Sequence, residues 1–133
     1  MFEYIGVIHI HSVFSDGSGE VSEIAEFGKE CGLDYLILTD HNTLRALQEG
    51  NERWYVNTLL LVGCEINDKM NQNHLLAMGI TETITTRIPA KEYTKKVKEL
   101  GGISFIAHPH EKRSSMTQHP PYPWTEWDCK DFD

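Results

Sequence analysis

Basic residues are scarce in this 133-residue chain, which has 12 Lys and Arg against 20 Asp and Glu and a formal net charge of −8. Charge-driven binding to nucleic acid or to a membrane surface depends on clustered Lys and Arg, so this charge balance argues against both. The longest strongly apolar run, residues 59–62, is far shorter than the ~20 residues that cross a bilayer, and the N-terminus lacks the basic start of a secretory signal. We therefore expect no membrane partner.

Cysteine is also scarce. Cys31, Cys64 and Cys129 are an odd number at wide spacing, which fits neither a disulfide framework nor a Cys-x-x-Cys metal motif. This pattern favours a reduced, cytoplasmic protein. No Walker-type Gly-x-x-x-x-Gly-Lys loop occurs, so the sequence does not support nucleotide-driven chemistry. A chain of this length with 40% hydrophobic and 24% charged residues predicts a single globular domain, residues 1–133.

Strand-like and helix-like segments alternate along the chain, and this order predicts an α/β fold with a largely parallel sheet. The expected strands are residues 4–11, 35–39, 59–65, 74–80 and 103–107, and the expected helices are residues 20–31, 43–53 and 89–100. Residues 111–133 differ, because their prolines and tryptophans predict an irregular segment that packs on other elements.

Two histidines stand at the end of the first expected strand. His9 and His11 are two residues apart, so regular alternation places their side chains on one face. Ile5 and Val7 would share that face, and the strand becomes polar only at its C-terminal end. Active sites of α/β sheets and barrels lie at this end of the strands. Alone, the pair could equally be two surface histidines on an edge strand.

The other strand ends favour the functional interpretation. The second expected strand ends in Asp40 and His41, the third ends in Glu65, the fifth ends in His108-Pro109-His110, and Asp16 lies in the loop after His11. Buried Asp, Glu and His are costly without partners, and imidazole together with carboxylate is a ligand set for Zn, Mn or Fe. The sequence therefore predicts a metal site at the C-terminal ends of the strands.

Three further residues need individual interpretations. His74 starts its strand, so it reaches the same rim only if an antiparallel hairpin follows Glu65, and we expect that hairpin. Asp40 either supports the site, as an orienting or catalytic group, or caps the helix that starts near Thr43. His110 is a ligand, a supporting group behind the ligands, or an exposed residue.

At this point the residues resemble a known family, the polymerase and histidinol phosphatase (PHP) domain. The motifs that carry the resemblance are His9-Ile10-His11-Ser12 with Phe14-Ser15-Asp16-Gly17, then Thr39-Asp40-His41, Gly63-Cys64-Glu65, Asn73-His74-Leu75 and Ala107-His108-Pro109. They occur in the family's order and cover residues 4–110. The chain resembles the stand-alone PHP phosphoesterases more than the PHP domains attached to DNA polymerases.

The resemblance implies a distorted, TIM-like (β/α)7 barrel with two to three divalent metal ions at its C-terminal rim. It also implies a ligand set: His9, His11 and Glu65 for one ion, Glu65, His74 and His108 for a second, and Asp16 and His41 for a third. A late Gly-Ser-Asp-x-His-like motif of the family is absent. We therefore expect an incomplete barrel truncated at its C-terminus, whose open edge is covered by a missing C-terminal half or by a second copy in a homo-oligomer.

The activity implied by the resemblance is hydrolysis of a phosphoric ester, with a metal-bound water as the nucleophile. The substrate would be a phosphorylated small molecule, a nucleotide or a short oligonucleotide. Two alternatives stay open. One is a non-catalytic, metal-binding scaffold domain like those of some polymerases. The other is an amidohydrolase-like metal hydrolase, which would act on amides or lactones.

Overall fold

A computed structural model describes residues 1–113 and 120–133 of the chain. In chain order the elements are β1 (Gly6–Ile10), α1 (Val21–Glu30), β2 (Tyr35–Leu38), α2 (Arg45–Gln48), β3 (Arg53–Tyr55), β4 (Thr58–Ile66), β5 (Leu75–Met78), α3 (Ala90–Glu99) and β6 (Ile103–Ile106). The expected α/β class is confirmed. Residues 120–133 contain no helix or strand, and the part of the expected irregular segment at 114–119 lies outside the described residues.

The six strands form one mixed sheet in the order β1-β2-β4-β5-β6, with β3 paired to β4. The pairs β1–β2 and β2–β4 are parallel, whereas β3–β4, β4–β5 and β5–β6 are antiparallel. The expectation of a largely parallel sheet is therefore wrong for three of these five strand pairs. Strand β5 reverses the chain direction within the sheet, and β6 reverses it again. Strand β6 therefore has the same direction within the sheet as β1, β2 and β4.

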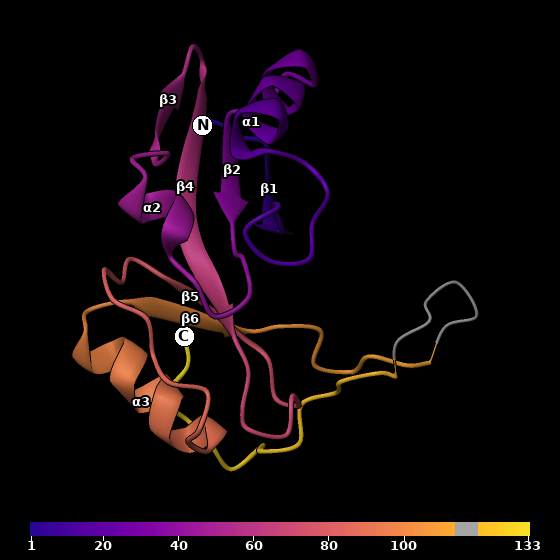
Figure 1. The fold of residues 1–133 in the computed structure, drawn as a ribbon, viewed down its shortest axis with the longest axis vertical. Coiled ribbons are helices and arrows are strands. Elements are labelled where there is room, and N and C mark those ends of the chain that lie inside the picture. The colour runs from indigo at the N-terminus through magenta and orange to yellow at the C-terminus, as the bar shows by residue number, and fades with distance from the viewer. Residues whose placement is uncertain (114–119) are drawn as a thin grey trace.

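The long strand β4 joins the two halves of the sheet. Its first part pairs with β2 and β3, and its last four residues pair with β5. In Figure 1, β5 and β6 cross below the end of β4 at a steep angle, so the sheet curls into a half-barrel. Helix α1 packs on β2 and β4, and α3 lies against the β5–β6 half. The curl brings the C-terminal ends of distant strands to one rim.

One expected helix is wrong in its second half. Residues 43–53 were expected to be helical, but α2 ends at Gln48 and residues 53–55 form a strand. Gly50 has a φ of +75°, a left-handed conformation that glycine adopts easily and that ends helices. Trp54 and Tyr55 then pair with β4 across a short turn, as aromatic residues favour strands.

The hydrophobic core lies between the sheet and its helices. Leu60, Val62 and Cys64 on β4 are at most 4% exposed, and burial raises the pKa of the Cys64 thiol to about 12. Gly28 of α1 sits so close to Leu36 that a Cβ would lie 2.6 Å from a Leu36 methyl carbon. This close packing fixes α1 on the strands that carry the polar rim.

The C-terminal segment belongs to the same core. Trp124 is 2% exposed and packs with the buried residues of the sheet, as expected for a segment that packs on other elements. Trp127 is 52% exposed. No helix in the described part of the chain has the length and apolarity needed to cross a membrane.

Candidate metal centre

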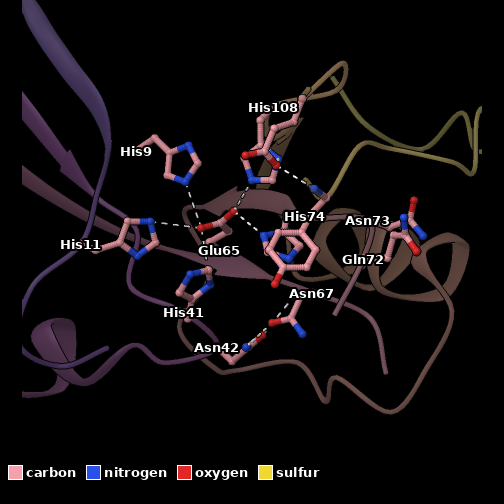
Figure 2. Close-up of polar contacts among 12 residues, drawn as sticks. His9, His11, His41, Asn42, Glu65, Asn67, Gln72, Asn73, His74 and His108 are labelled. Atoms are coloured by element: carbon pink, nitrogen blue, oxygen red, sulfur yellow. Dashed lines mark hydrogen bonds and ion pairs between the residues drawn. The ribbon is translucent and has the colours of Figure 1, made fainter. Parts of the chain in front are cut away.

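The polar residues at the strand ends meet around one open cavity of about 500 Å³. Figure 2 shows the histidine rings converging on a single carboxylate, that of Glu65. The cavity is lined by His9, His11, Asp16, His41, Asn42, Glu65, Asn67, Asn71, His74, His108, Glu111 and Tyr122. All seven residues predicted as ligands from the sequence therefore lie in one place.

Glu65 is the centre of the cluster and its side chain is 1% exposed. Its Oε2 atom lies 2.9 Å from His9 Nε2 and 3.1 Å from His11 Nε2. Its Oε1 atom lies 2.8 Å from His74 Nδ1 and 3.1 Å from His108 Nε2. Each carboxylate oxygen thus has its own pair of histidines within 3.1 Å.

Asp16 forms a second centre at the edge of the cavity. Its Oδ1 atom lies 3.2 Å from His11 Nδ1, and its Oδ2 atom lies 3.6 Å from His41 Nε2. The other ring nitrogen of His41 is 3.5 Å from Glu65 Oε2. His11 and His41 therefore connect the exposed carboxylate of Asp16 with the buried carboxylate of Glu65.

The end of β1 departs from the regular alternation expected of it. The register shifts between Ile8 and Ile10, and His9 has a φ of +66°, which marks a bulge. Ile10 packs on the core, whereas Val7 and Ile8 are exposed. The prediction from strict alternation is thus wrong, because the bulge redirects the backbone at His9. Both His9 and His11 nevertheless reach Glu65.

The expected hairpin after Glu65 is confirmed. Strands β4 and β5 are antiparallel, with Ile66 opposite Leu75, so the chain returns and His74 lies beside Glu65. The carboxylate of Asp68 shapes the connecting loop, because it accepts hydrogen bonds from Met70 N at 3.0 Å and Gln72 N at 2.8 Å.

Asp40 lies behind the cavity. It is 3% exposed, and it accepts hydrogen bonds from Ser12 N and Ser12 Oγ, both at 2.7 Å, and from Ser15 Oγ at 2.6 Å. These bonds hold the loop that carries Asp16. The helix-capping interpretation of Asp40 is wrong, since its oxygens face this loop and α2 has no side-chain cap.

His110 points elsewhere. It is exposed, and its ring stacks on Trp127 with centroids 5.3 Å apart. The described lining of the cavity does not include it. Of the three interpretations left open for His110, the exposed one matches its position.

The sequence reasoning missed five residues of the cavity lining. They are Asn42, Asn67, Asn71, Glu111 and Tyr122. Asn42 and Asn67 hold each other: the Asn42 amide donates to Asn67 Oδ1, and the Asn67 backbone N–H donates to Asn42 Oδ1. Of these five residues, only Asn42 could have been found from the sequence, because it directly follows His41. Glu111 and Tyr122 reach the cavity through the tertiary packing of the segment after β6.

The electrostatics favour an ionised Glu65. Burial would raise the pKa of Glu65, but hydrogen bonds from His108, His11, His74 and His9 outweigh it and hold the pKa below its usual range. The hydrogen bond to Glu65 raises the pKa of both His11 and His108, against their burial. Burial lowers the pKa of His41.

The donor set fits divalent metal ions. Three groups of donor atoms lie within 4.8 Å of one another: His9, Glu65 and His108; His11, Asp16 and His41; and His41, Glu65 and His74. His74 Nε2 and His108 Nδ1 are buried without a hydrogen-bond partner among the described residues. None of the described lining residues is Lys or Arg, so a metal ion is the natural countercharge for Glu65 and Asp16.

The sequence profile of the PHP domain matches residues 8–107. An uncharacterized protein of Methanocaldococcus jannaschii is 25% identical over 115 residues, which cover 77% of this chain and 66% of that protein. The phosphoribosyl 1,2-cyclic phosphate 1,2-diphosphodiesterase of Eggerthella lenta is 30% identical over 82 residues, which cover 56% of this chain and 30% of the enzyme.

Two solved structures share the fold. One is a two-domain protein of Bacteroides vulgatus that contains a predicted PHP-like metal-dependent phosphoesterase, with a TM-score of 0.67 and 23% identity over 92% of this chain and 39% of that one. The other is a putative metal-dependent phosphoesterase of Bifidobacterium adolescentis, with a TM-score of 0.68 and 18% identity over 86% of this chain and 70% of that one. The chain thus spans less than two thirds of both curated relatives and of the first of these structures.

Proposed function

This chain belongs to the PHP domain family, and from that premise we propose that it carries the metal centre of a metal-dependent phosphoesterase. The observation that supports the proposal best is the buried Glu65, whose two oxygens face separate pairs of histidines. We also propose that the curled sheet is one wall of a TIM-like (β/α)7 barrel, which the likeness to the two solved structures supports.

The proposed ligand sets follow the contacts of the two carboxylates. His9, His11 and Glu65 would hold one ion, and Glu65, His74 and His108 would hold a second. Asp16 and His41 would hold a third. Glu65 would serve two of these ions, so loss of one of them should loosen the other. Imidazole and carboxylate donors suit Zn, Mn or Fe.

When bound, divalent ions would supply positive charge for phosphoryl oxygens and would acidify water enough to make it a nucleophile near neutral pH. The protein itself contributes the two carboxylates and keeps the ligand side chains in place. Glu65 stays ionised because histidines donate to it, and Asp16 places a second carboxylate at the cavity edge. Asn42 and Asn67 brace the wall beside His41, where their amides can orient polar groups of a substrate.

We propose a phosphorylated small molecule, a nucleotide or a short oligonucleotide as the substrate. The name of the Eggerthella relative, a cyclic phosphate diphosphodiesterase, supports phosphoester chemistry for this chain. The absence of Lys and Arg from the described cavity lining means that metal ions would supply the positive charge that a phosphate group needs. We place the reaction in the cytoplasm, which agrees with the free cysteines.

Reconstitution with Mn, Zn or Fe tests the proposed function. We expect the purified protein to bind metal, measured by plasma mass spectrometry, and to hydrolyse phosphoesters in a substrate screen only when loaded. A chelator should abolish the activity, and the same metal should restore it. Metal binding without hydrolysis of any phosphoester would favour the scaffold alternative, and hydrolysis of amides or lactones would favour the amidohydrolase-like one.

Metal affinity should fall as the pH falls, and the fall should begin above the ordinary histidine pKa of about 6.5. Glu65 raises the pKa of His11 and His108, so these ligands keep their protons to a higher pH and protons compete with metal there. The metal-free protein gains stability from these two histidines below the unfolded pKa and loses it as the pH rises through their raised pKa values.

Competition titration with a chelator between about pH 6 and 8 measures this effect. We expect up to about a tenfold weaker affinity per pH unit for each proton displaced. His41→Ala should leave the pH dependence in place, because burial lowers the pKa of His41. An affinity that does not change over this range would contradict the assignment of His11 and His108 as ligands.

A further inference from the structure

Part of the cavity wall comes from two residues that lie beyond the last of the sequence motifs. Glu111 and Tyr122 both line the cavity. The backbone N–H of Tyr122 donates to Glu111 Oε2 at 2.8 Å, and the Tyr122 ring stacks on His74 with centroids 5.3 Å apart and planes 12° from parallel. The same Glu111 oxygen lies 3.4 Å from His108 Nδ1. One carboxylate therefore connects both histidines on the Oε1 side of Glu65.

Two further hydrogen bonds fasten this segment beside the histidines. The backbone N–H of Trp124 donates to the carbonyl of Pro109 at 3.2 Å, and that of Thr125 donates to Asn73 Oδ1 at 2.7 Å. Pro109 directly follows one histidine, and Asn73 directly precedes the other. Because Trp124 is also buried in the core, residues 122–125 are anchored beside both histidines.

The two nitrogens of His108 have different surroundings. Nε2 lies 3.1 Å from Glu65 Oε1, and Nδ1 is buried with no hydrogen bond among the described residues. An imidazole that offers Nε2 to a metal carries its proton on Nδ1, and metal-bound histidines almost always give that proton to a carboxylate, a carbonyl or water. Glu111 needs to move only about half an ångström to reach hydrogen-bond distance.

Removing Glu111 would take away the carboxylate beside His108 Nδ1 and also the acceptor that holds the backbone of Tyr122.

We infer that Glu111 is a positioning residue of the metal centre, which accepts the Nδ1 proton of His108 and so presents Nε2 to the ion between His74 and His108. This inference rests on the proposed metal-binding function. It assigns to the segment after β6 a role in metal affinity. Through the contact of Tyr122 with His74, the same carboxylate stabilises the second histidine of that ion.

The test uses zinc-loaded protein and the variants Glu111→Ala and Glu111→Gln. Glu126→Gln is the matched control, because it removes a carboxylate from the same segment and Glu126 is not among the described cavity-lining residues. Zinc affinity is measured by chelator competition, and the Nδ1–H proton of His108 is observed by NMR of ¹⁵N-labelled protein. Unfolding midpoints of the metal-free proteins report any general loss of structure.

We expect Glu111→Ala to weaken the binding of one ion by about 10–100-fold and to expose the His108 Nδ1–H to solvent exchange. Glu111→Gln should have a smaller effect, because its amide oxygen still accepts, and the control should match the unsubstituted protein. If Glu111→Ala does not fold, the zinc affinity and the His108 Nδ1–H signal of Glu111→Gln decide the test. Unchanged affinity, or weaker binding with an unchanged His108 Nδ1–H signal, would overturn the inference. Failure of the unsubstituted protein to bind zinc would overturn the proposed function and this inference with it.

Discussion

Glu65→Gln is expected to remove more metal than any other single substitution in the chain. Each Glu65 oxygen faces its own pair of histidines at 2.8–3.1 Å, so the neutral amide would weaken two ions at once. Loss of a group that only supports a ligand costs about 10–100-fold in affinity, and loss of a shared ligand should cost at least the upper end of that range. The near-identical shape of glutamine keeps the packing around the buried side chain.

Metal content after dialysis against a weak chelator, measured by plasma mass spectrometry, gives the result directly. Substitution of one histidine on a single side, His9→Ala or His74→Ala, should deplete fewer ions than Glu65→Gln. His110→Ala is the matched control, since this histidine stacks on Trp127. Equal metal loss from His110→Ala, or full metal content in Glu65→Gln, would contradict the shared carboxylate.

Asp40→Asn is expected to destabilise the fold and to loosen Asp16 without removing a metal ligand. The buried carboxylate of Asp40 accepts two hydrogen bonds from Ser12 and one from Ser15. Hydrogen bonds to a charged group contribute about 1.5–3 kcal/mol each, and the amide of asparagine is uncharged and turns one acceptor into a donor, so a serine hydroxyl that donates to Asp40 would have to turn and accept. We expect a loss of about 2–4 kcal/mol in the free energy of unfolding.

Denaturant unfolding of the metal-free protein measures this loss, and metal titration then shows the weaker third ion at Asp16 and His41. Asp34→Asn is the matched control. Asp34 is another strand-flanking aspartate, but it accepts one hydrogen bond, from Ile5 N at 2.7 Å, and should cost about 1 kcal/mol or less. If Asp40→Asn lost metal at every site with no loss of stability, Asp40 would be acting as a ligand.

The chemistry of the rim could be predicted from the sequence because it depends on local order. His9 and Glu65 stand near the end of an apolar strand, and His41 and His108 follow one. Strands that point the same way deliver their ends to one edge. His74 could be predicted only through its hairpin, since a strand that starts with a histidine must reverse to bring that residue to the rim. The antiparallel pairing of β4 and β5 bears out that reasoning.

Local patterns failed where the backbone leaves its regular course. Regular alternation along β1 placed Val7 on the same face as both histidines. The bulge at His9 breaks that alternation, and it has no signature in side-chain hydrophobicity. The helix expected over residues 43–53 extended through Gly50, although the left-handed conformation there ends it. In both places a single residue with positive φ decided the geometry.

The sequence by itself determined the α/β class, the family and the residue types of the rim, because hydrophobic periodicity and closely spaced motifs are short-range properties. Tertiary structure alone decided three things: the curl of the sheet along β4, the bonding of Asp40 to the loop before Asp16, and the arrival of Glu111 and Tyr122 at the cavity. Each depends on contacts between residues far apart in the chain, such as Tyr122 with His74, and the packing of the whole core fixes those contacts.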